Sequence, residues 1–319
     1  NFLKDISQEF FTKGPKITYH DHQLCHASLA FFQSGFEKSA ILTVDGRGER
    51  STGLLGYGKK NEIIKIRDLE YPNSLGLLYA SITQFLGFRA ESDEWKVMAL
   101  GAYSNPPKLN SYIKKFNELY HFDSTTNNFF LNMDYFSFTN PETNDGKFYT
   151  NKLIKLIGNE RRSSEKIQMK HFDIAYALQF HFELIMIKLL NFLYKKFPTQ
   201  NLVLAGGCIM NCKFNGKIIE KTKFKNIYIP SAPDDSGISI GAALLSSYKN
   251  KKYNKRKKII TNYWGREFSD VEILKILNSF KLKFFKPSNL FDEVANLLSN
   301  KFLIGWFQGR SEFGQRALG

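Results

Sequence analysis

Two histidines head the stretch His22-Gln23-Leu24-Cys25-His26-Ala27-Ser28-Leu29-Ala30-Phe31-Phe32, whose other residues are mostly small or apolar. On a helix, His22 and His26 are four residues apart and share one face. Two imidazole nitrogens so placed suit a divalent transition ion such as iron, zinc or nickel, and Asp21 is positioned to orient one ring. The alternative is that these histidines cap and line a helix with satisfied hydrogen bonds.

A buried strand is predicted after this helix, over residues 39–46. The run Ile41-Leu42-Thr43-Val44 is short, apolar and β-branched, and it ends in Asp45-Gly46. The glycines that follow alternate with apolar residues and predict a hairpin that continues the strand. Asp45, at the tip of the strand, has the position of many metal and phosphate ligands, and the equal alternative is a plain turn residue.

Further elements are predicted from apolar spacing. Helices are expected over residues 74–86 and about 172–196, and the second helix leads into a strand at 201–205. Residues 104–170 lack clear periodicity, as expected for an insertion that shapes substrate selection. Lys96 lies at a loop-to-helix junction, where it is either an anion contact or, as its spacing favours, a surface charge.

Two later motifs have the chemistry of a ligand site. Gly206 and Gly207 end the second strand and lack Cβ atoms, so their backbone amides can approach a phosphate or sugar, with Asn211 one turn further on. Asp235 and Ser236 open a helix rich in small residues, and either one can be its N-cap. Alternatively, Asp235 is a hard oxygen ligand that completes the site begun by the two histidines and the strand-tip carboxylate.

Composition permits anionic partners without pointing to one. The 45 Lys and Arg residues exceed the 30 Asp and Glu residues, and the net charge of +15 would attract nucleotides or RNA at long range. The lysines are nevertheless spread through surface-type segments such as 249–258, and the aromatic residues do not follow the stacking pattern of an RNA-binding sheet. Nucleic acid is therefore not expected as a partner.

The cysteines and the hydropathy pattern indicate a cytoplasmic protein. Cys25, Cys208 and Cys212 are an odd number without the spacing of a disulfide framework. Cys208 and Cys212 follow the Gly-Gly turn, where buried thiols are expected in preference to a pair of thiolate ligands. No apolar run reaches the ~20 residues that a membrane-spanning helix needs, so no membrane contact is expected.

Several motifs, in one order, resemble those of the O-carbamoyltransferase family that acts on nodulation factors, cephems and tobramycin. They are His22-Gln23-Leu24-Cys25-His26-Ala27, Leu42-Thr43-Val44-Asp45-Gly46, Glu94-Trp95-Lys96-Val97-Met98, Leu204-Ala205-Gly206-Gly207-Cys208-Ile209-Met210-Asn211-Cys212-Lys213-Phe214-Asn215-Gly216, Pro233-Asp234-Asp235-Ser236-Gly237 and Gly305-Trp306-Phe307-Gln308-Gly309-Arg310-Ser311-Glu312-Phe313-Gly314-Gln315-Arg316-Ala317-Leu318-Gly319. The match spans the whole chain apart from the middle insertion, and the chain is expected to be truncated at both ends.

The resemblance implies an α/β fold in two parts. Residues 1–248 are expected to form an actin-like (ribonuclease-H-like) two-lobed domain that binds metal and nucleotide and transfers the carbamoyl group. Residues 259–319 are expected to begin a second, incomplete α/β domain that forms carbamoyl-adenylate. The basic run 249–258 between them is expected to be an exposed linker.

The implied reaction moves a carbamoyl group from carbamoyl phosphate, through an ATP-derived carbamoyl-adenylate, to a hydroxyl of a small-molecule or sugar acceptor. The metal is expected to be iron(II) or another divalent transition ion, with magnesium as a further candidate. Two alternatives stay open: a transferase of the tRNA threonylcarbamoyl-adenosine type, and a non-catalytic nucleotide-binding relative. Neither the acceptor nor the oligomeric state can be inferred from the sequence.

The resemblance also assigns roles to single residues. The implied metal ligands are His22, His26, Asp45 and Asp235. The implied nucleotide contacts are Gly206, Gly207, Asn211, Ser236 and Gly237. The catalytic candidates are His20 as a base, for which a surface histidine is the simpler interpretation, and Lys96 and Arg316 as anion contacts, joined by Arg310.

Two departures from the family pattern affect these roles. Gln23 stands where the family usually has a second histidine, which leaves the pair His22 and His26 intact but removes one polar contact. Gln315 replaces a proline before Arg316, so the turn that presents this arginine is expected to be looser.

Overall fold

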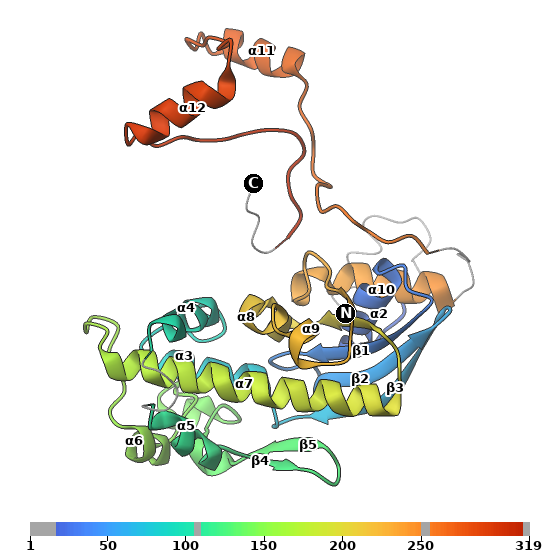
Figure 1. The fold of residues 1–319 in the computed structure, drawn as a ribbon, viewed down its shortest axis with the longest axis vertical. Coiled ribbons are helices and arrows are strands. Elements are labelled where there is room, and N and C mark those ends of the chain that lie inside the picture. Colours follow the sequence, from blue (N-terminus) through green and yellow to red (C-terminus); the bar gives the residue numbers. More distant parts are fainter. Residues whose placement is uncertain (1–16, 105–109, 250–255, 315–319) are drawn as a thin grey trace. The chain divides into compact units, whose positions relative to one another are not determined.

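A mixed five-stranded sheet lies at the centre of the larger part of the chain (Figure 1). The computed structural model describes residues 17–104, 110–249 and 256–314. The strands of this sheet are β1 (Lys38–Val44), β2 (Ser51–Lys59), β3 (Glu62–Glu70), β6 (Asn201–Ala205) and β7 (Asn226–Tyr228). In the order β3-β2-β1-β6-β7, the pairs β3–β2 and β2–β1 are antiparallel, whereas β1–β6 and β6–β7 are parallel.

Helices cover both faces of the sheet, as alternate side chains of β1 show. Ile41 packs in one apolar cluster with residues of α2 (His22–Gln33) and α10 (Ile238–Lys249), while Ala40 and Leu42 pack in another with α3 (Leu75–Phe85) and α7 (Met169–Lys196). Strands buried on both faces read as continuous apolar runs, which explains the sequence of β1. The predicted α/β fold class is confirmed, and the strand order is that of a ribonuclease-H-like sheet.

The elements predicted from apolar spacing are present. The strand expected at 39–46 is β1, the hairpin after it is β1–β2, and the strand expected at 201–205 is β6. The helix expected at 74–86 is α3, whose N-cap Ser74 accepts a hydrogen bond from Leu77 N. The helix expected at 172–196 is α7, which begins at Met169.

The region 104–170 adds to the first domain's core. Its short elements are α5 (Tyr112–Lys115), β4 (Tyr120–Asp123), β5 (Asn128–Leu131) and α6 (Asn151–Ile157). The two strands pair with each other in a separate antiparallel sheet. Phe116, Phe129 and Leu153 are buried in the same apolar cluster as α3 and α7, so the insertion packs on these helices.

The remaining elements are short. The other α-helices in the described residues of the first unit are α4 (Glu94–Leu100), α8 (Cys212–Asn215) and α9 (Ile218–Lys221). The 3₁₀ turns are η1 (Gly101–Tyr103), η2 (Phe116–Glu118), η3 (Met133–Tyr135), η4 (Pro141–Asn144), η5 (Gly207–Met210) and η6 (Asp235–Gly237). Among the described residues, no helix is both long enough and apolar enough to cross a bilayer.

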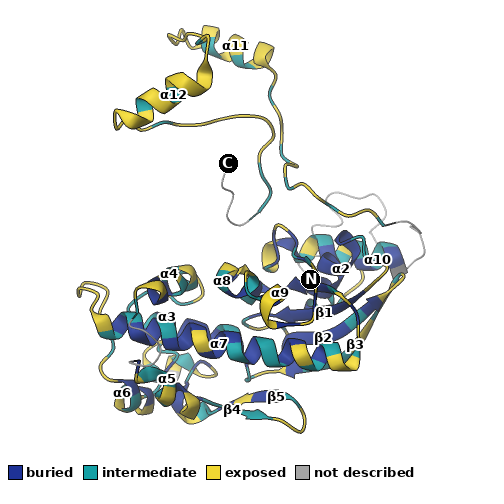
Figure 2. Cartoon of the chain, viewed as in Figure 1, coloured by how far each residue is buried: buried dark blue, intermediate teal, exposed yellow. Residues whose placement is uncertain are grey.

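The chain separates into two compact units, Asn1–Lys258 and Ile259–Gly319. The described part of the second unit contains α11 (Asp270–Ser279), α12 (Leu290–Ser299) and one isolated bridge between Tyr263 and Glu312, and no strand. None of its described residues, 259–314, is buried (Figure 2). The functions expected of the two parts remain predictions.

Most of the predicted linker 249–258 lies outside the described residues, which omit 250–255. Its end departs from the expectation of full exposure. The guanidinium of Arg256 lies 4.3 Å from the centroid of the Phe31 ring on α2 and is half-buried there, because the flat cation stacks on an aromatic face.

Candidate metal centre

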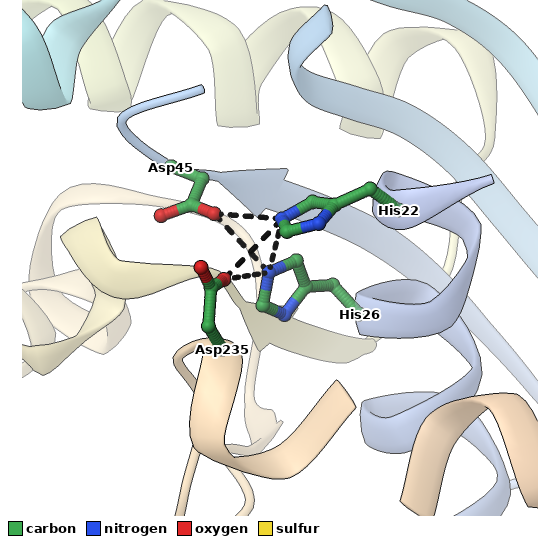
Figure 3. Close-up of side chains that lie close together, drawn as sticks. All are labelled: His22, His26, Asp45 and Asp235. Carbon is green, nitrogen blue, oxygen red and sulfur yellow. Dashed lines mark hydrogen bonds and ion pairs between the residues drawn. The ribbon is translucent and has the colours of Figure 1, made fainter. Parts of the chain in front are cut away.

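Four side chains from distant parts of the sequence meet at the carboxyl end of β1 (Figure 3). His22 Nε2 lies 3.0 Å from Asp45 Oδ2 and 3.3 Å from Asp235 Oδ1. His26 Nε2 lies 3.2 Å from each of these two oxygens and 3.1 Å from His22 Nε2. The four ligand atoms all lie within 4.8 Å of one another, so the structure brings together the four residues suggested as metal ligands.

Helix α2 delivers the two imidazoles. Asp21 caps it by accepting a hydrogen bond from Leu24 N at 2.8 Å, so Asp21 serves the helix and not, as the sequence suggested, the ring of a histidine. Thr43 Oγ1 on β1 donates a hydrogen bond to Gln23 Oε1 on α2 at 2.5 Å, and both side chains are fully buried. This bond ties α2 to the strand that ends in Asp45. Close packing of α2 on α10 depends on Gly241, where a Cβ would collide with the Cys25 carbonyl.

The Gly-Gly turn after β6 orients Asp45. Gly207 N donates a hydrogen bond to Asp45 Oδ1 at 3.0 Å, which leaves Oδ2 directed at the histidines. Gly206 has φ +96°, and a Cβ there would collide with the Val44 carbonyl. Both glycines therefore have a structural role at this site: Gly206 allows the close approach to β1, and Gly207 orients Asp45. Their contact with a nucleotide remains a prediction.

The electrostatics of the four residues are strongly coupled. Hydrogen bonds to Asp235 and Asp45 raise the pKa of His22 to about 10. Burial lowers the pKa of His26, but hydrogen bonds to the same two carboxylates outweigh it, and the net shift is upward. Burial opposes ionisation of Asp45, yet its bonds to both histidines hold the pKa of this carboxyl well below its usual range. Without an ion, a proton on His22 thus offsets part of the negative charge of the two carboxylates.

The donor set fits a divalent transition ion. Ligands about 2.0 to 2.2 Å from such an ion, at the corners of a tetrahedron or an octahedral face, are about 2.8 to 3.6 Å apart. The five nitrogen and oxygen separations given above, from 3.0 to 3.3 Å, lie in that range. Two Nε2 atoms in contact cannot both donate to each other, whereas both can direct lone pairs to one cation. His26 Nδ1, buried and without a hydrogen-bond partner among the described residues, would carry the remaining ring proton.

Comparisons with known proteins place the chain in a family. Residues 5–244 match the sequence model described as "Carbamoyltransferase N-terminus". The chain belongs to the carbamoyltransferase family. The resemblance of its motifs to this family of transferase enzymes is thereby confirmed.

The curated relatives are longer than this chain. It is 35% identical over 314 residues to the uncharacterized protein sll1178 of Synechocystis, covering 96% of this chain and 50% of that protein. It is 32% identical over 319 residues to the nodulation protein NolNO of Sinorhizobium fredii, covering 98% and 44%. It is 31% identical to the nodulation protein NolO of Bradyrhizobium diazoefficiens, covering 94% and 52%. The chain thus spans about half the length of these curated relatives.

Solved structures give a weaker likeness. HypF of T. kodakarensis is 13% identical, with a TM-score of 0.38 over 73% of this chain and 37% of that one. Full-length HypF, in a form described as phosphate- and nucleotide-bound, is 16% identical, with a TM-score of 0.38 over 78% and 45%.

The other suggested nucleotide contacts form contacts within this chain. Asn211 is buried, and its amide forms two hydrogen bonds with the amide of Gln179. Gly237 is buried where a Cβ would collide with the Ala232 carbonyl. Ser236 is exposed, and its hydroxyl donates to Asp234 Oδ1 at 2.7 Å. Contact of these residues with a nucleotide remains a prediction.

The suggested catalytic residues lie outside the four-residue cluster. His20 Nε2 lies 2.7 Å from Ser246 Oγ on α10. Lys96 forms an ion pair with Asp93 at 2.9 Å and is partly exposed, in line with the surface interpretation. Arg316 is outside the described residues, and Arg310 pairs with Glu267 inside the second unit. The catalytic roles of these residues remain predictions.

The cysteines differ from one another. All three are free thiols, and Cys25 is buried on α2. Burial raises the pKa of Cys25 to about 11 and holds the pKa of Cys208 well above its usual value. Cys212 is exposed, so the expectation of a buried thiol is wrong there, and it is met only in part by Cys208, whose burial is intermediate. The first residue of α8 points outward, because the helix buries Phe214 instead.

Sequence reasoning missed two buried polar residues of α7. Gln179 and Glu183 follow directly after the apolar positions Leu178 and Phe182, and their exposed fractions are only 2% and 8%. Polar side chains four residues apart beside an apolar stripe were the available signal.

Proposed function

We propose that this chain carries the carbamoyl-transfer part of an O-carbamoyltransferase. The observation that supports this most is the convergence of His22, His26, Asp45 and Asp235, in a chain whose residues 5–244 match the N-terminal carbamoyltransferase family. The donor would be carbamoyl phosphate, activated with ATP to carbamoyl-adenylate, and the acceptor a hydroxyl of a small molecule or sugar. The setting would be the cytoplasm, and residues 259–319 would begin the part that forms the adenylate.

The four clustered residues would hold the ion, iron(II) or another divalent ion. When bound, the ion would neutralise phosphate charge and polarise the carbamoyl carbonyl. Asp45 can serve it through Oδ2 while Oδ1 stays on Gly207 N, so the carboxylate is oriented before the ion arrives. His26 is fully buried whereas the Asp235 side chain is 65% exposed, so the substrate side of the ion would be the side of Asp235.

Side chains of the protein would then deprotonate the acceptor and bind the substrates. When the acceptor oxygen bonds to the carbamoyl carbon, the bond from that carbon to the adenylate's phosphate oxygen breaks and AMP leaves. The attacking hydroxyl must also lose its proton, and His20 is the proposed base, through Nε2. That atom contacts Ser246 Oγ, so His20 would have to exchange this partner for the acceptor hydroxyl. Lys96, Arg310 and Arg316 would contact anionic groups of the substrates.

The test compares the wild-type chain with His26→Ala and His121→Ala. His121 is exposed on β4 and lies outside the cluster, so its variant is a matched control. Each protein is loaded with iron(II) or zinc and its bound metal is measured. Each is then given carbamoyl-adenylate and a panel of hydroxylated sugars and small molecules, with carbamoylated products detected by mass spectrometry.

The wild type and His121→Ala should bind one ion and form a carbamate ester, and His26→Ala should lose at least nine-tenths of both. Wild-type levels of ion and product in His26→Ala would contradict the proposal, as would a wild type that binds no ion and forms no ester. Products found on tRNA alone would favour the tRNA-modifying alternative.

A further inference from the structure

A buried polar cluster joins α7 to the turn that follows β6. Gln179 Oε1 accepts hydrogen bonds from Tyr79 Oη at 3.0 Å and Asn211 Nδ2 at 2.8 Å. Gln179 Nε2 donates to Asn211 Oδ1 at 3.0 Å and to Glu183 Oε1 at 2.8 Å. Lys217 Nζ, nearer the surface, pairs with Glu183 Oε2 at 2.6 Å.

Every hydrogen-bonding position of the Gln179 amide is occupied. The amide offers two donors and two acceptor sites, and each has a partner. The Glu183 carboxylate pairs with Lys217 and can only accept, so the Gln179 nitrogen must face it and the amide oxygen must face Tyr79. Buried polar groups that satisfy one another in this way select a single arrangement of the elements they join.

One 3₁₀ turn, η5, connects the cluster to the Asp45 carboxylate. Asn211 caps α8 and ends η5, and its backbone N–H donates to the Cys208 carbonyl at 3.2 Å. The other end of η5 is Gly207, whose N–H donates to Asp45 Oδ1. A single 3₁₀ turn therefore separates the amide pair on α7 from the hydrogen bond that orients Asp45.

We propose that Gln179 is a positioning residue for the metal centre, which acts through Asn211 and η5 to hold Gly207 N–H against Asp45. Asp45 Oδ1 is thereby occupied and Oδ2 is presented to the ion. If the amide pair is lost, the turn can shift while α2 and β1 keep their packing, and Asp45 then loses its fixed orientation. The inference rests on the proposed function, because it assumes that an ion binds these ligands.

The experiment measures zinc affinity of the full chain, by competition with a chromophoric chelator, together with the melting temperature. Gln179→Met keeps the length of the side chain and removes its hydrogen bonds. Asn211→Ser keeps an N-cap oxygen for α8 and removes the amide pair, so it addresses the same link with less risk to folding. Both variants should bind one zinc ion with at least tenfold weaker affinity than the wild type.

The double variant tests whether both residues act through one pair. Its affinity should be no more than about threefold below that of the weaker single variant, since the shared contact can be lost only once. His181→Phe is the control: His181 is equally buried on α7, but it bonds to Tyr120 and to the Ile113 carbonyl, away from η5. It should lower the melting temperature and leave zinc affinity within twofold of wild type.

The possible results separate the two proposals. Wild-type zinc affinity in both single variants, multiplicative losses in the double variant, or an equal loss in His181→Phe would overturn the role of Gln179. In each of these cases zinc binding that is abolished by His26→Ala would still support the metal centre. A wild type that binds no zinc, iron(II) or manganese would overturn both.

Discussion

The two units of the chain have similar helix caps but differ in how far their side chains are buried. Ser74 caps α3 in the first unit, and Ser269 caps α11 in the second through a complete capping box with Glu272. Helix α3 buries most of its side chains against α7, whereas α11 and α12 bury none (Figure 2). Phe291 on α12 remains 75% exposed, while Phe182 on α7 is 1% exposed.

This difference separates what starts a helix from what stabilises it. A cap contributes about 1 kcal/mol, whereas full burial of one large apolar side chain contributes about 1.5 to 3 kcal/mol. The first unit adds dozens of such side chains in two clusters on the faces of its sheet. The second unit has helical sequences and caps, but its described residues supply no interior to which the apolar faces could contribute.

The largest expected contrast is in amide hydrogen exchange. In the full chain, amides of β1 and the middle of α7 open only with the unfolding of the first unit, so they should exchange on the order of 1,000-fold or more slowly than those of α11 and α12. Mass spectrometry of peptic fragments measures both sets in one sample. Equal protection of α12 and β1 would mean that the apolar side chains of the second unit are covered in solution.

Truncating one phenylalanine in each unit gives a smaller contrast. Phe182→Ala removes a ring that packs edge-on against Tyr79 and Phe214, and it should lower the free energy of unfolding by about 3 to 5 kcal/mol. Phe291→Ala removes an exposed ring and should change it by less than about 0.5 kcal/mol. Urea unfolding followed by circular dichroism at 222 nm compares the two, and a similar loss for Phe291→Ala would show that α12 packs on a core.

The sequence predicted the parts of the site that depend on local pattern. The spacing of His22 and His26 and the polar end of the β1 run are short-range features, and the structure keeps both. Asp235 lies 209 residues from His26, and spacing alone left it between an N-cap and a ligand. The family motifs joined it to the others, because long-range pairing is not encoded in any local pattern.

The features that were missed or mistaken depend on tertiary packing. The Asn211 motif gave no sign that its amide pairs with Gln179, which lies 32 residues earlier on α7. The exposure of Cys212 depends on which face of the four-residue α8 turns inward. The sequence also could not predict how much of the second domain is buried. The amphipathic spacing of α12 shows that this helix can bury one face, but it does not show whether a partner covers that face.

The smallest expected contrast is in the pH dependence of stability, and it is expected in the first unit alone. All six histidines of the chain lie between residues 20 and 181, so the second unit has none that titrates near neutrality. Because the pKa of His22 is raised to about 10, the site without an ion holds a proton there at pH 7. A raised histidine pKa stabilises the ion-free fold below the ordinary value near 6.5, and this contribution should be lost as the pH rises towards about 10.

Ion binding should have the opposite pH dependence, because the ion must displace that proton. Zinc affinity should rise about tenfold per pH unit between pH 6.5 and 8.5 for each proton displaced. Asp235→Asn removes the largest cause of the raised pKa of His22, so this variant should bind more weakly and show a flatter slope. His121→Ala, outside the cluster, should reproduce the wild-type slope. A zinc affinity that is independent of pH over this range would mean that the imidazoles are already neutral, and that the two carboxylates are balanced by another cation.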